Sequence, residues 1–202
     1  MSTFQQDVFG LTVLQNNHPD IRKLRKQTGT PAIHGNKFWK STYLLMDYLK
    51  ESPPKKGVKV LELGCGWGLA GIFCAKKFDA KVTSLDADPL VFPYLHHHAY
   101  INGIEVRSWQ QRYENVTKKH LEAFDLVIAA DICFWDEMAK PLFNLVRRAQ
   151  QVGGTRVVMT DPGRDPFREM ATQCAKSLGA TYDNWFCLPP YKATGLVMDV
   201  NF

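Results

Sequence analysis

The stretch Val58–Gly71, VKVLELGCGWGLAG, decides the fold class of this chain of 202 residues. It begins as a β-type apolar run, passes through the alternating glycines Gly64, Gly66 and Gly68, and continues into an apolar helical pattern. Glycines are needed where a backbone turns sharply and must approach a ligand without a side chain in the way. We therefore interpret the stretch as a strand, a ligand-binding turn and a helix, rather than as a turn that serves no ligand.

On the C-terminal side of this stretch, short β-type runs alternate with helical patterns. Their spacing of roughly 20–30 residues is typical of parallel strands joined by crossover helices. The last two runs are joined by Pro189-Pro190-Tyr191-Lys192 and are expected to form an antiparallel hairpin. We predict an α/β fold with a doubly wound, mostly parallel sheet of seven strands and a terminal antiparallel hairpin. The expected strands are 58–63, 81–86, 105–108, 124–130, 155–160, 182–188 and 193–200; the expected helices are 69–77, 90–101, 137–150 and 165–178.

The segment before the glycine-rich stretch is set apart by the turn-rich connector SPPKKG at 52–57. Residues 37–50 carry a helical apolar pattern, whereas residues 1–36 are expected to be irregular. A basic cluster lies in the irregular part, and its simplest interpretation is a solvated face. We divide the chain into an N-terminal extension over 1–56 and one compact ligand-binding domain over 57–202. The basic cluster consists of Arg22, Lys23, Arg25 and Lys26.

Composition excludes several classes of protein. Hydrophobic residues make up 45% of the chain and charged residues 22%, which excludes wholesale disorder and fibrous architectures. No run of about 18 apolar residues occurs, so we expect no membrane-spanning helix. The start MSTFQQDVFG lacks the pattern of a secretory signal, and five cysteines without a C-x-x-C pair indicate reduced thiols in the cytoplasm. The net charge of +5 permits nucleic-acid or acidic-protein partners.

No metal site is expected. The run His96-His97-His98 is the one sequence feature that suggests a metal ion. Successive residues of a helix point about 100° apart, so three in a row cannot face one ion. We assign the run to the surface or to packing.

Two cofactor classes compete for the glycine turn. Read from Gly66, GWGLAG satisfies the G-x-G-x-x-G pattern of dinucleotide-binding domains. Read from Glu62, ELGCGWG is E-x-G-x-G-x-G and resembles the first motif of class I S-adenosylmethionine-dependent methyltransferases. Asp86, at the end of the second strand, suits the ribose hydroxyls of either cofactor. Glu62 favours the second class, because a carboxylate there attracts a cationic amino-acid tail and repels a pyrophosphate.

Three further segments resemble one family within that class, the seven-strand lysine methyltransferase-like family. Residues 34–49, HGNKFWKSTYLLMDYL, resemble its stretch before the first motif. Residues 124–137, FDLVIAADICFWDE, resemble its fourth-strand motif, in which an acid is followed three positions later by Tyr or Phe; these are Asp131 and Phe134 here. The segment TDPGR at 160–164 resembles bacterial members of the group. The resemblance spans residues 34–200 and predicts S-adenosylmethionine as the cofactor.

The resemblance also implies roles for single residues. Asp86 would hold the ribose hydroxyls, and Ala129 would contact the adenine or the methionine moiety. The wider class often has an Asp after the third strand that touches the adenine amino group; here Gln110 or Gln111 offers an amide oxygen instead. The expected cofactor-binding residues are Trp39, Glu62, Gly64, Gly66, Gly68, Asp86, Ala87, Gln110, Gln111 and Ala129.

The implied reaction is N-methylation of a protein lysine or of an N-terminal amine. Asp131 and the aromatic wall of Phe134 are the expected catalytic residues, and Trp135 is the expected substrate contact. Methylation of a small metabolite amine and cofactor binding without catalysis stay open. The absence of an N-P-P-Y-type tetrapeptide at the fourth strand disfavours nucleic acid as substrate. The resemblance further implies that residues 1–36 form an ordered lid beside Asp131, with the basic cluster facing an acidic surface of the substrate.

Overall fold

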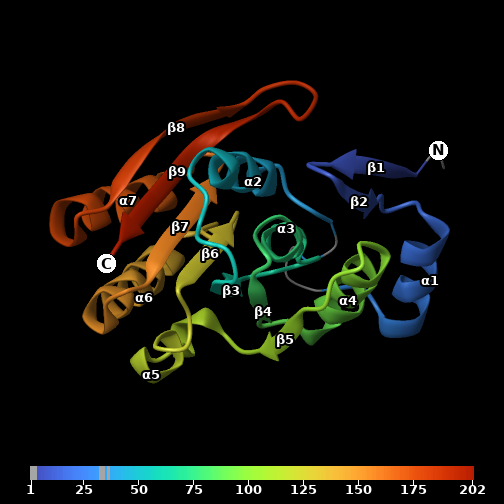
Figure 1. Cartoon of the computed structure of the whole chain (residues 1–202), viewed down its shortest axis with the longest axis horizontal. Helices are drawn as coiled ribbons and strands as arrows, with labels where there is room; N and C mark the ends of the chain where they lie inside the picture. The colour runs from blue at the N-terminus through green and yellow to red at the C-terminus, as the bar shows by residue number, and fades with distance from the viewer. Residues whose placement is uncertain (1–3, 32–34, 36) are drawn as a thin grey trace.

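The computed structural model describes residues 4–31, 35 and 37–202, and its main feature is a seven-stranded sheet (Figure 1). The strand order is β5-β4-β3-β6-β7-β9-β8, and every pairing is parallel except those of β9 with β7 and with β8. The predicted doubly wound α/β fold with a terminal hairpin is confirmed. The strands are β3 (Lys59–Leu63), β4 (Lys81–Asp86), β5 (Arg107–Gln110), β6 (Leu126–Ala130), β7 (Arg156–Asp161), β8 (Thr181–Cys187) and β9 (Ala193–Asn201).

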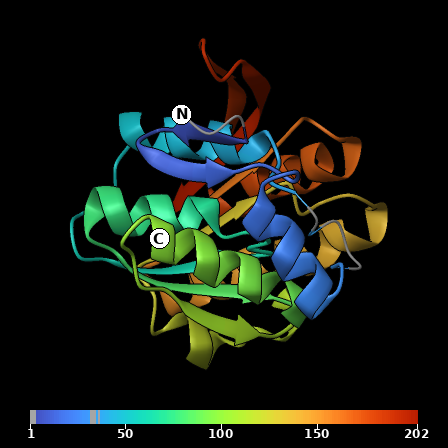
Figure 2. The same ribbon diagram turned by 90° about the vertical axis from the view of Figure 1, so that its right-hand side faces the viewer.

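Helices cover both faces of the sheet, because alternate residues of the central strands are apolar on both sides. In β3, Val60 belongs to the core beneath α2, α3 and α4, whereas Leu61 and Leu63 belong to the core beneath α6 and α7. Figures 1 and 2 show the two helical layers. The helices are α2 (Ser41–Glu51), α3 (Leu69–Phe78), α4 (Phe92–Ile101), the short α5 (Lys118–Leu121), α6 (Asp136–Val152) and α7 (Asp165–Leu178), with 3-10 turns η1 (Pro89–Val91) and η2 (Tyr113–Asn115).

The described part of the N-terminal segment contains two strands and a helix, so the prediction of an irregular stretch over residues 1–36 is wrong there. It forms a two-stranded antiparallel hairpin of β1 (Gln5–Val8) and β2 (Leu11–Leu14), followed by helix α1 (Pro19–Thr28). The hairpin and α1 lie beside α4, as Figure 2 shows. The buried side chains of the hairpin, such as Val8 and Leu11, belong to the same core as Val60. The hairpin is therefore packed as part of the domain core.

One strand of the main sheet is shifted from its predicted position. The third parallel strand was expected at 105–108 and lies at Arg107–Gln110. Ile104 and Val106 pack against the core just before it, while the strand residues at this edge of the sheet are mostly exposed. The apolar residues that predicted the strand therefore lie just before it rather than within it. The shift places Gln110 beside Asp86 in the parallel register.

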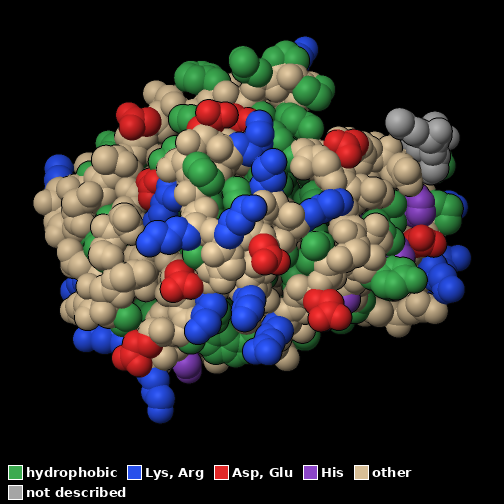
Figure 3. Space-filling model, in the orientation of Figure 1, with side chains coloured by type: hydrophobic (Ala, Val, Ile, Leu, Met, Phe, Trp, Pro, Cys, Tyr) green, Lys and Arg blue, Asp and Glu red, His purple; other side chains and the backbone are tan. Residues whose placement is uncertain are grey.

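The surface is mixed in charge on the face seen in Figure 3, where basic and acidic side chains lie among hydrophobic ones. Within the part of the chain that the structure describes, no helix has the length and the apolar character needed to cross a bilayer.

Candidate active site

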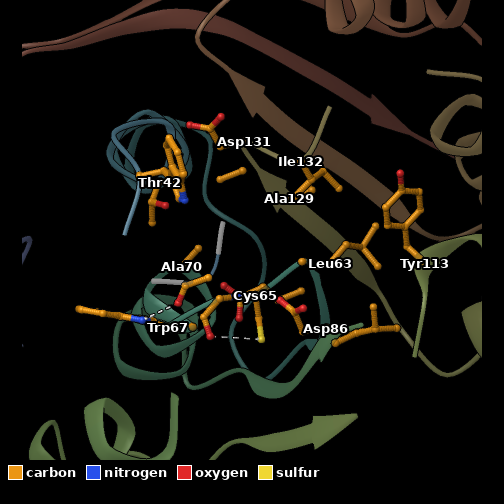
Figure 4. A pocket seen from close by; sticks show the side chains of 18 of the residues that line it. Thr42, Leu63, Cys65, Trp67, Ala70, Asp86, Tyr113, Ala129, Asp131 and Ile132 are labelled. Atoms are coloured by element: carbon orange, nitrogen blue, oxygen red, sulfur yellow. Dashed lines mark hydrogen bonds between the residues drawn. The ribbon is translucent and has the colours of Figure 1, made fainter. Parts of the chain in front are cut away.

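Two adjoining pockets lie at the carboxyl ends of the parallel strands, where the chain leaves β3 and β6 toward opposite sides. This is the switch point at which open α/β sheets bind ligands. The inner pocket, seen in Figure 4, is bordered by the glycine turn after β3 and by the ends of β4 and β6. The sequence-predicted residues that line it are Trp39, Glu62, Gly64, Gly66, Gly68, Asp86, Ala87, Gln111, Ala129, Asp131 and Phe134.

The glycine turn leaves open space at one position. Gly66 has φ +51°, and a Cβ atom built on it would meet no atom within 4 Å. A Cβ on Gly64 would lie 2.6 Å from Ile132 Cγ2, and one on Gly68 would overlap Leu95. Protein packing therefore explains the absence of side chains at Gly64 and Gly68. At Gly66 the free space belongs to the pocket, as expected where a backbone approaches a ligand.

Asp86 holds the turn in place. Its carboxylate oxygen Oδ2 accepts the N–H of Gly66 at 3.0 Å, and Oδ1 accepts the N–H of Asp88 at 3.0 Å. Burial raises the pKa of Asp86, and these hydrogen bonds oppose the rise. Asp88 instead caps η1 by accepting the N–H of Leu90 at 2.9 Å, and it lines neither pocket. Asp86 is thus the acidic residue at the end of β4 that lines the inner pocket.

Glu62 is buried beneath the turn, and its charge has partners within the protein. Its carboxylate accepts the N–H of Gly71 at 3.0 Å and the hydroxyl of Ser84 at 2.6 Å. Burial raises the pKa of Glu62 to about 7, against the lowering effect of the two hydrogen bonds. The residue therefore links β3, β4 and α3 while it also borders the inner pocket.

Only one of the two glutamines proposed for adenine reaches the inner pocket. Gln111 lines it, and its amide oxygen accepts the N–H of Arg112 at 2.9 Å and the side-chain amide of Asn115 at 3.0 Å. Gln110 is exposed at the end of β5 and lines neither pocket. Of the two glutamines, Gln111 alone lies at the inner pocket, and its amide oxygen already accepts two hydrogen bonds within the protein.

A buried cluster of charges lies at the end of β6, in the left-handed turn at Asp131 (φ +62°). Arg164 forms an ion pair with Asp131, and its Nη1 atom lies 2.6 Å from Oδ2 of Asp161. The hydroxyl of Ser41 donates to the second oxygen of Asp131 at 3.0 Å. The Arg164 guanidinium also lies over the ring of Phe134, 4.3 Å from its centre. Asp131 is therefore already paired inside the protein.

Sequence reasoning missed Arg164 and Ser41 as site residues. Both lie within the segments that carry the family resemblance, 160–164 and 34–49. Their place in these segments was the signal that could have identified them, because a polar residue within a motif that borders a site is a candidate site residue.

The two tryptophans proposed for the site have different places. The Trp39 ring meets Phe134 edge-on, with ring centres 5.7 Å apart, and Trp39 lines both pockets. Trp135 is 50% exposed, and although its ring centre lies 5.7 Å from that of Phe134, it lines neither pocket. The structure thus brings Trp39 to the site and leaves Trp135 on the surface beside it.

The outer pocket opens from Asp131 to the surface, and its rim is basic. Lys37, Lys40 and Lys192 line it and are exposed, while Asp131 is the one carboxylate among the described residues that line it. The β1–β2 hairpin borders this pocket through Gln6 and the residues just after β2. Arg22, Lys23 and Lys26 of α1 line a separate depression, and the four basic residues of α1, Arg25 included, line neither of these two pockets.

His98 and the cysteines have packing roles, whereas His96 is exposed. His98 is buried, accepts the N–H of Leu14 at Nε2, and stacks on Trp67 with ring centres 5.2 Å apart; burial lowers its pKa to about 4. All five cysteines are free thiols and buried. In the described ranges 4–31, 35 and 37–202, no three His, Cys, Asp or Glu side chains are grouped so as to hold a metal ion.

Comparisons with solved structures agree with this fold. An rRNA methylase from Streptococcus thermophilus superposes with a TM-score of 0.60 and 16% identity, covering 80% of this chain and 96% of that one. A tRNA (uracil-54, C5)-methyltransferase from Pyrococcus abyssi, solved with S-adenosyl-L-homocysteine, gives a TM-score of 0.64 and 18% identity, covering 97% and 42%. At these identities the likeness concerns the fold.

Sequence comparisons identify the family. The chain is 28% identical over 131 residues to the electron transfer flavoprotein beta subunit lysine methyltransferase of Xenopus laevis, covering 64% of this chain and 52% of that protein. It is 26% identical over 153 residues to the calmodulin-lysine N-methyltransferase of Arabidopsis thaliana, covering 71% and 50%. The chain thus spans about half the length of these relatives. A family model described as lysine methyltransferase matches residues 17–169. The chain therefore belongs to the lysine methyltransferase family.

Proposed function

We propose that this protein is an S-adenosylmethionine-dependent N-methyltransferase that modifies a lysine, or an N-terminal amine, of a protein substrate. Its family and the named activities of its relatives support this reaction. The observation that carries the proposal is the pair of adjoining pockets, which meet at Asp131 and Trp39. An inner pocket for the cofactor and an outer pocket for the amine acceptor then meet where a methyl group would be transferred.

The residues of the inner pocket fit the cofactor. The open space above Gly66 allows the backbone to approach it, and the carboxylate of Asp86 faces this pocket as an acceptor for ribose hydroxyls. Glu62 supplies negative charge near a cationic amino-acid tail, and Gln111 lies where adenine contacts are expected. When bound, S-adenosylmethionine supplies an activated methyl group on its sulfonium, so the protein must contribute alignment rather than strong acid–base chemistry.

The residues around Asp131 prepare the acceptor. A lysine side chain in water has a pKa of about 10.4 and must lose a proton before its nitrogen can attack. The carboxylate of Asp131 attracts the ammonium, and the rings of Phe134 and Trp39 exclude water from it. Exclusion of water favours the neutral amine, because burial disfavours the charged form, and the proton leaves to solvent through the outer pocket, which opens to the surface.

The substrate is expected to present an acidic surface around its target amine. Lys37, Lys40 and Lys192 form the exposed rim of the outer pocket and would receive that surface. Charge complementarity of this kind speeds encounter and sets the orientation of the partner.

The free thiols of all five cysteines fit a reducing compartment such as the cytoplasm.

Methyl transfer from tritiated S-adenosylmethionine tests the proposal. The full chain is incubated with a lysate from cells that lack its gene, and label is followed into proteins, nucleic acids and small molecules. We expect label in a protein band. Asp131→Ala should lose this label while it still binds S-adenosylhomocysteine in a calorimetric titration. Label in small amines alone would show that the substrate is a metabolite and not a protein. Unchanged labelling by Asp131→Ala would show that Asp131 takes no part in the reaction.

A further inference from the structure

The side chains that would recognise the substrate cation already hold a cation of this chain. The Asp131 side chain is 2% exposed, and the guanidinium that pairs with it also lies over the face of Phe134. A carboxylate next to an aromatic face is a strong site for a cation, because both attract positive charge in a place with little water. The Arg164 guanidinium occupies it, paired with Asp131 and 4.3 Å from the ring centre of Phe134.

Arg164 has a second anchor that does not depend on Asp131. Its Nη1 atom lies 2.6 Å from Oδ2 of Asp161, and its backbone N–H donates to Oδ1 of Asp161 at 2.8 Å. The Asp161 side chain is fully buried and also accepts the N–H of Gly163. The guanidinium can therefore leave Asp131 and still keep a charged partner.

The charges of this cluster leave room for one more cation. Asp131 and Asp161 contribute two carboxylates, and Arg164 contributes one guanidinium. The other basic side chains of the outer pocket are exposed and screened by water; they are Lys37, Lys40 and Lys192. An ammonium that enters the outer pocket would therefore still be attracted by the two buried carboxylates.

Arg164 also stands on the route that an acceptor must take. It lines the outer pocket, Phe134 lines the inner pocket, and Asp131 lines both. The Arg164 side chain is 25% exposed, so an entering group can reach it from the surface.

We propose, on the basis of the proposed function, that Arg164 is an internal plug of the acceptor site and that the substrate ammonium replaces its guanidinium on Asp131 and Phe134. The guanidinium stays on Asp161 during this exchange. A plug lowers the apparent affinity for every cation by the fraction of molecules in which the site is open. A protein substrate overcomes this loss through its contacts at the basic rim, whereas a free small amine has no such contacts. Arg164 is therefore a specificity-determining residue that favours protein lysines over free amines.

Binding of n-butylammonium to the full chain loaded with S-adenosylhomocysteine tests the plug. This probe carries the cation of a lysine side chain without a peptide, and 1-butanol is its neutral counterpart. In a calorimetric titration we expect Arg164→Gln to bind n-butylammonium at least tenfold more tightly than the unmodified protein. Binding of 1-butanol should not change. Arg168→Gln, which removes an exposed arginine of α7, is the matched control and should leave both affinities as they were.

Two further measurements keep the outcomes distinct. Arg164→Lys retains a cation for Asp161 but cannot bridge both carboxylates with a planar fork, so its affinity for n-butylammonium should rise several-fold. If Arg164→Gln fails to fold, the affinity of Arg164→Lys for n-butylammonium tests the plug instead. Equal or weaker binding of n-butylammonium by a folded Arg164 variant overturns the plug and leaves Arg164 as a support for Asp131. Failure of the unmodified protein to bind S-adenosylhomocysteine would instead overturn the proposed function.

Discussion

At the scale of single residues, the glycines of the turn can be separated by what surrounds them. Gly66 and Gly68 both have positive φ, so a side chain at either position carries a backbone strain of about 1–2 kcal/mol. They differ in space: the Cβ position of Gly66 is open to the pocket, and that of Gly68 is filled by Leu95. Substitution at one position should therefore act on the ligand, and at the other on the fold.

Gly66→Val should fold with a loss of stability of about 1–2 kcal/mol and should lose more than tenfold in affinity for S-adenosylhomocysteine. The branched side chain would fill the space that the cofactor needs. Gly68→Val should lose clearly more stability, because Leu95 must move. Urea unfolding and calorimetric titration measure the two effects. Undiminished affinity in Gly66→Val would show that no ligand approaches the backbone there.

At the scale of elements, the sequence predicted the parts with a strong local pattern and missed those made by distant contacts. The β1–β2 hairpin has strands of four residues each, too short for a periodic signal. It is held by partners far along the chain: the N–H of Leu14 donates to His98, and the N–H of Phe9 donates to the hydroxyl of Tyr191, on which its ring also stacks. None of these pairings can be inferred from local sequence.

The site followed the same division. Asp86 was predicted from its place at the end of a recognisable strand, and Asp131 from the resemblance of residues 124–137 to the fourth-strand motif; the ends of these parallel strands meet at one edge of the sheet. Arg164 was missed because its role depends on the pairing of β6 with β7, which brings Asp131 and Asp161 to one guanidinium. Acidic residues at strand ends can be located from sequence, whereas the cation that neutralises their carboxylates depends on the order of the strands in the sheet.

The basic elements lead to a test of where the substrate docks. Replacing the three rim lysines together by Gln should raise the KM for the protein substrate several-fold and weaken the dependence of KM on salt, with little change in kcat. Screening acts over about 8 Å at physiological ionic strength, so only charges near the docked partner should contribute. Replacing the four basic residues of α1 by Gln is the control and should change KM less. A larger effect from the α1 residues would move the docking surface to that helix. The rim residues are Lys37, Lys40 and Lys192; the α1 residues are Arg22, Lys23, Arg25 and Lys26.

At the scale of the whole molecule, two buried groups make stability depend on pH in opposite directions. The pKa of Glu62 is raised to about 7, so its contribution is full below its unfolded pKa of about 4.3 and is lost as the pH rises through 7. The pKa of His98 is lowered to about 4, so its contribution is full above about 6.5 and is lost as the pH falls through 4. From these two groups, the free protein should be most stable near pH 5–6.

Cofactor binding should oppose the effect of Glu62. If the ammonium of the cofactor's amino-acid tail lies near this carboxylate, it favours the ionised form and lowers the pKa of Glu62. Binding of S-adenosylhomocysteine near pH 6.5 should then release a proton, and the affinity should increase from pH 6 to pH 8. Titrations in buffers of different ionisation enthalpy measure the proton directly.

The matched variant is Glu62→Gln, whose amide oxygen can still accept the N–H of Gly71 and whose charge does not change with pH. It should bind S-adenosylhomocysteine more weakly at pH 8, with an affinity that no longer rises with pH, and it should keep more of its stability between pH 5 and pH 8 than the unmodified protein. An affinity of the unmodified protein that is the same at pH 6 and pH 8, with no proton released, would restrict Glu62 to its structural bridge between Gly71 and Ser84. The same carboxylate would then stabilise the centre of the fold without contributing charge to the cofactor site.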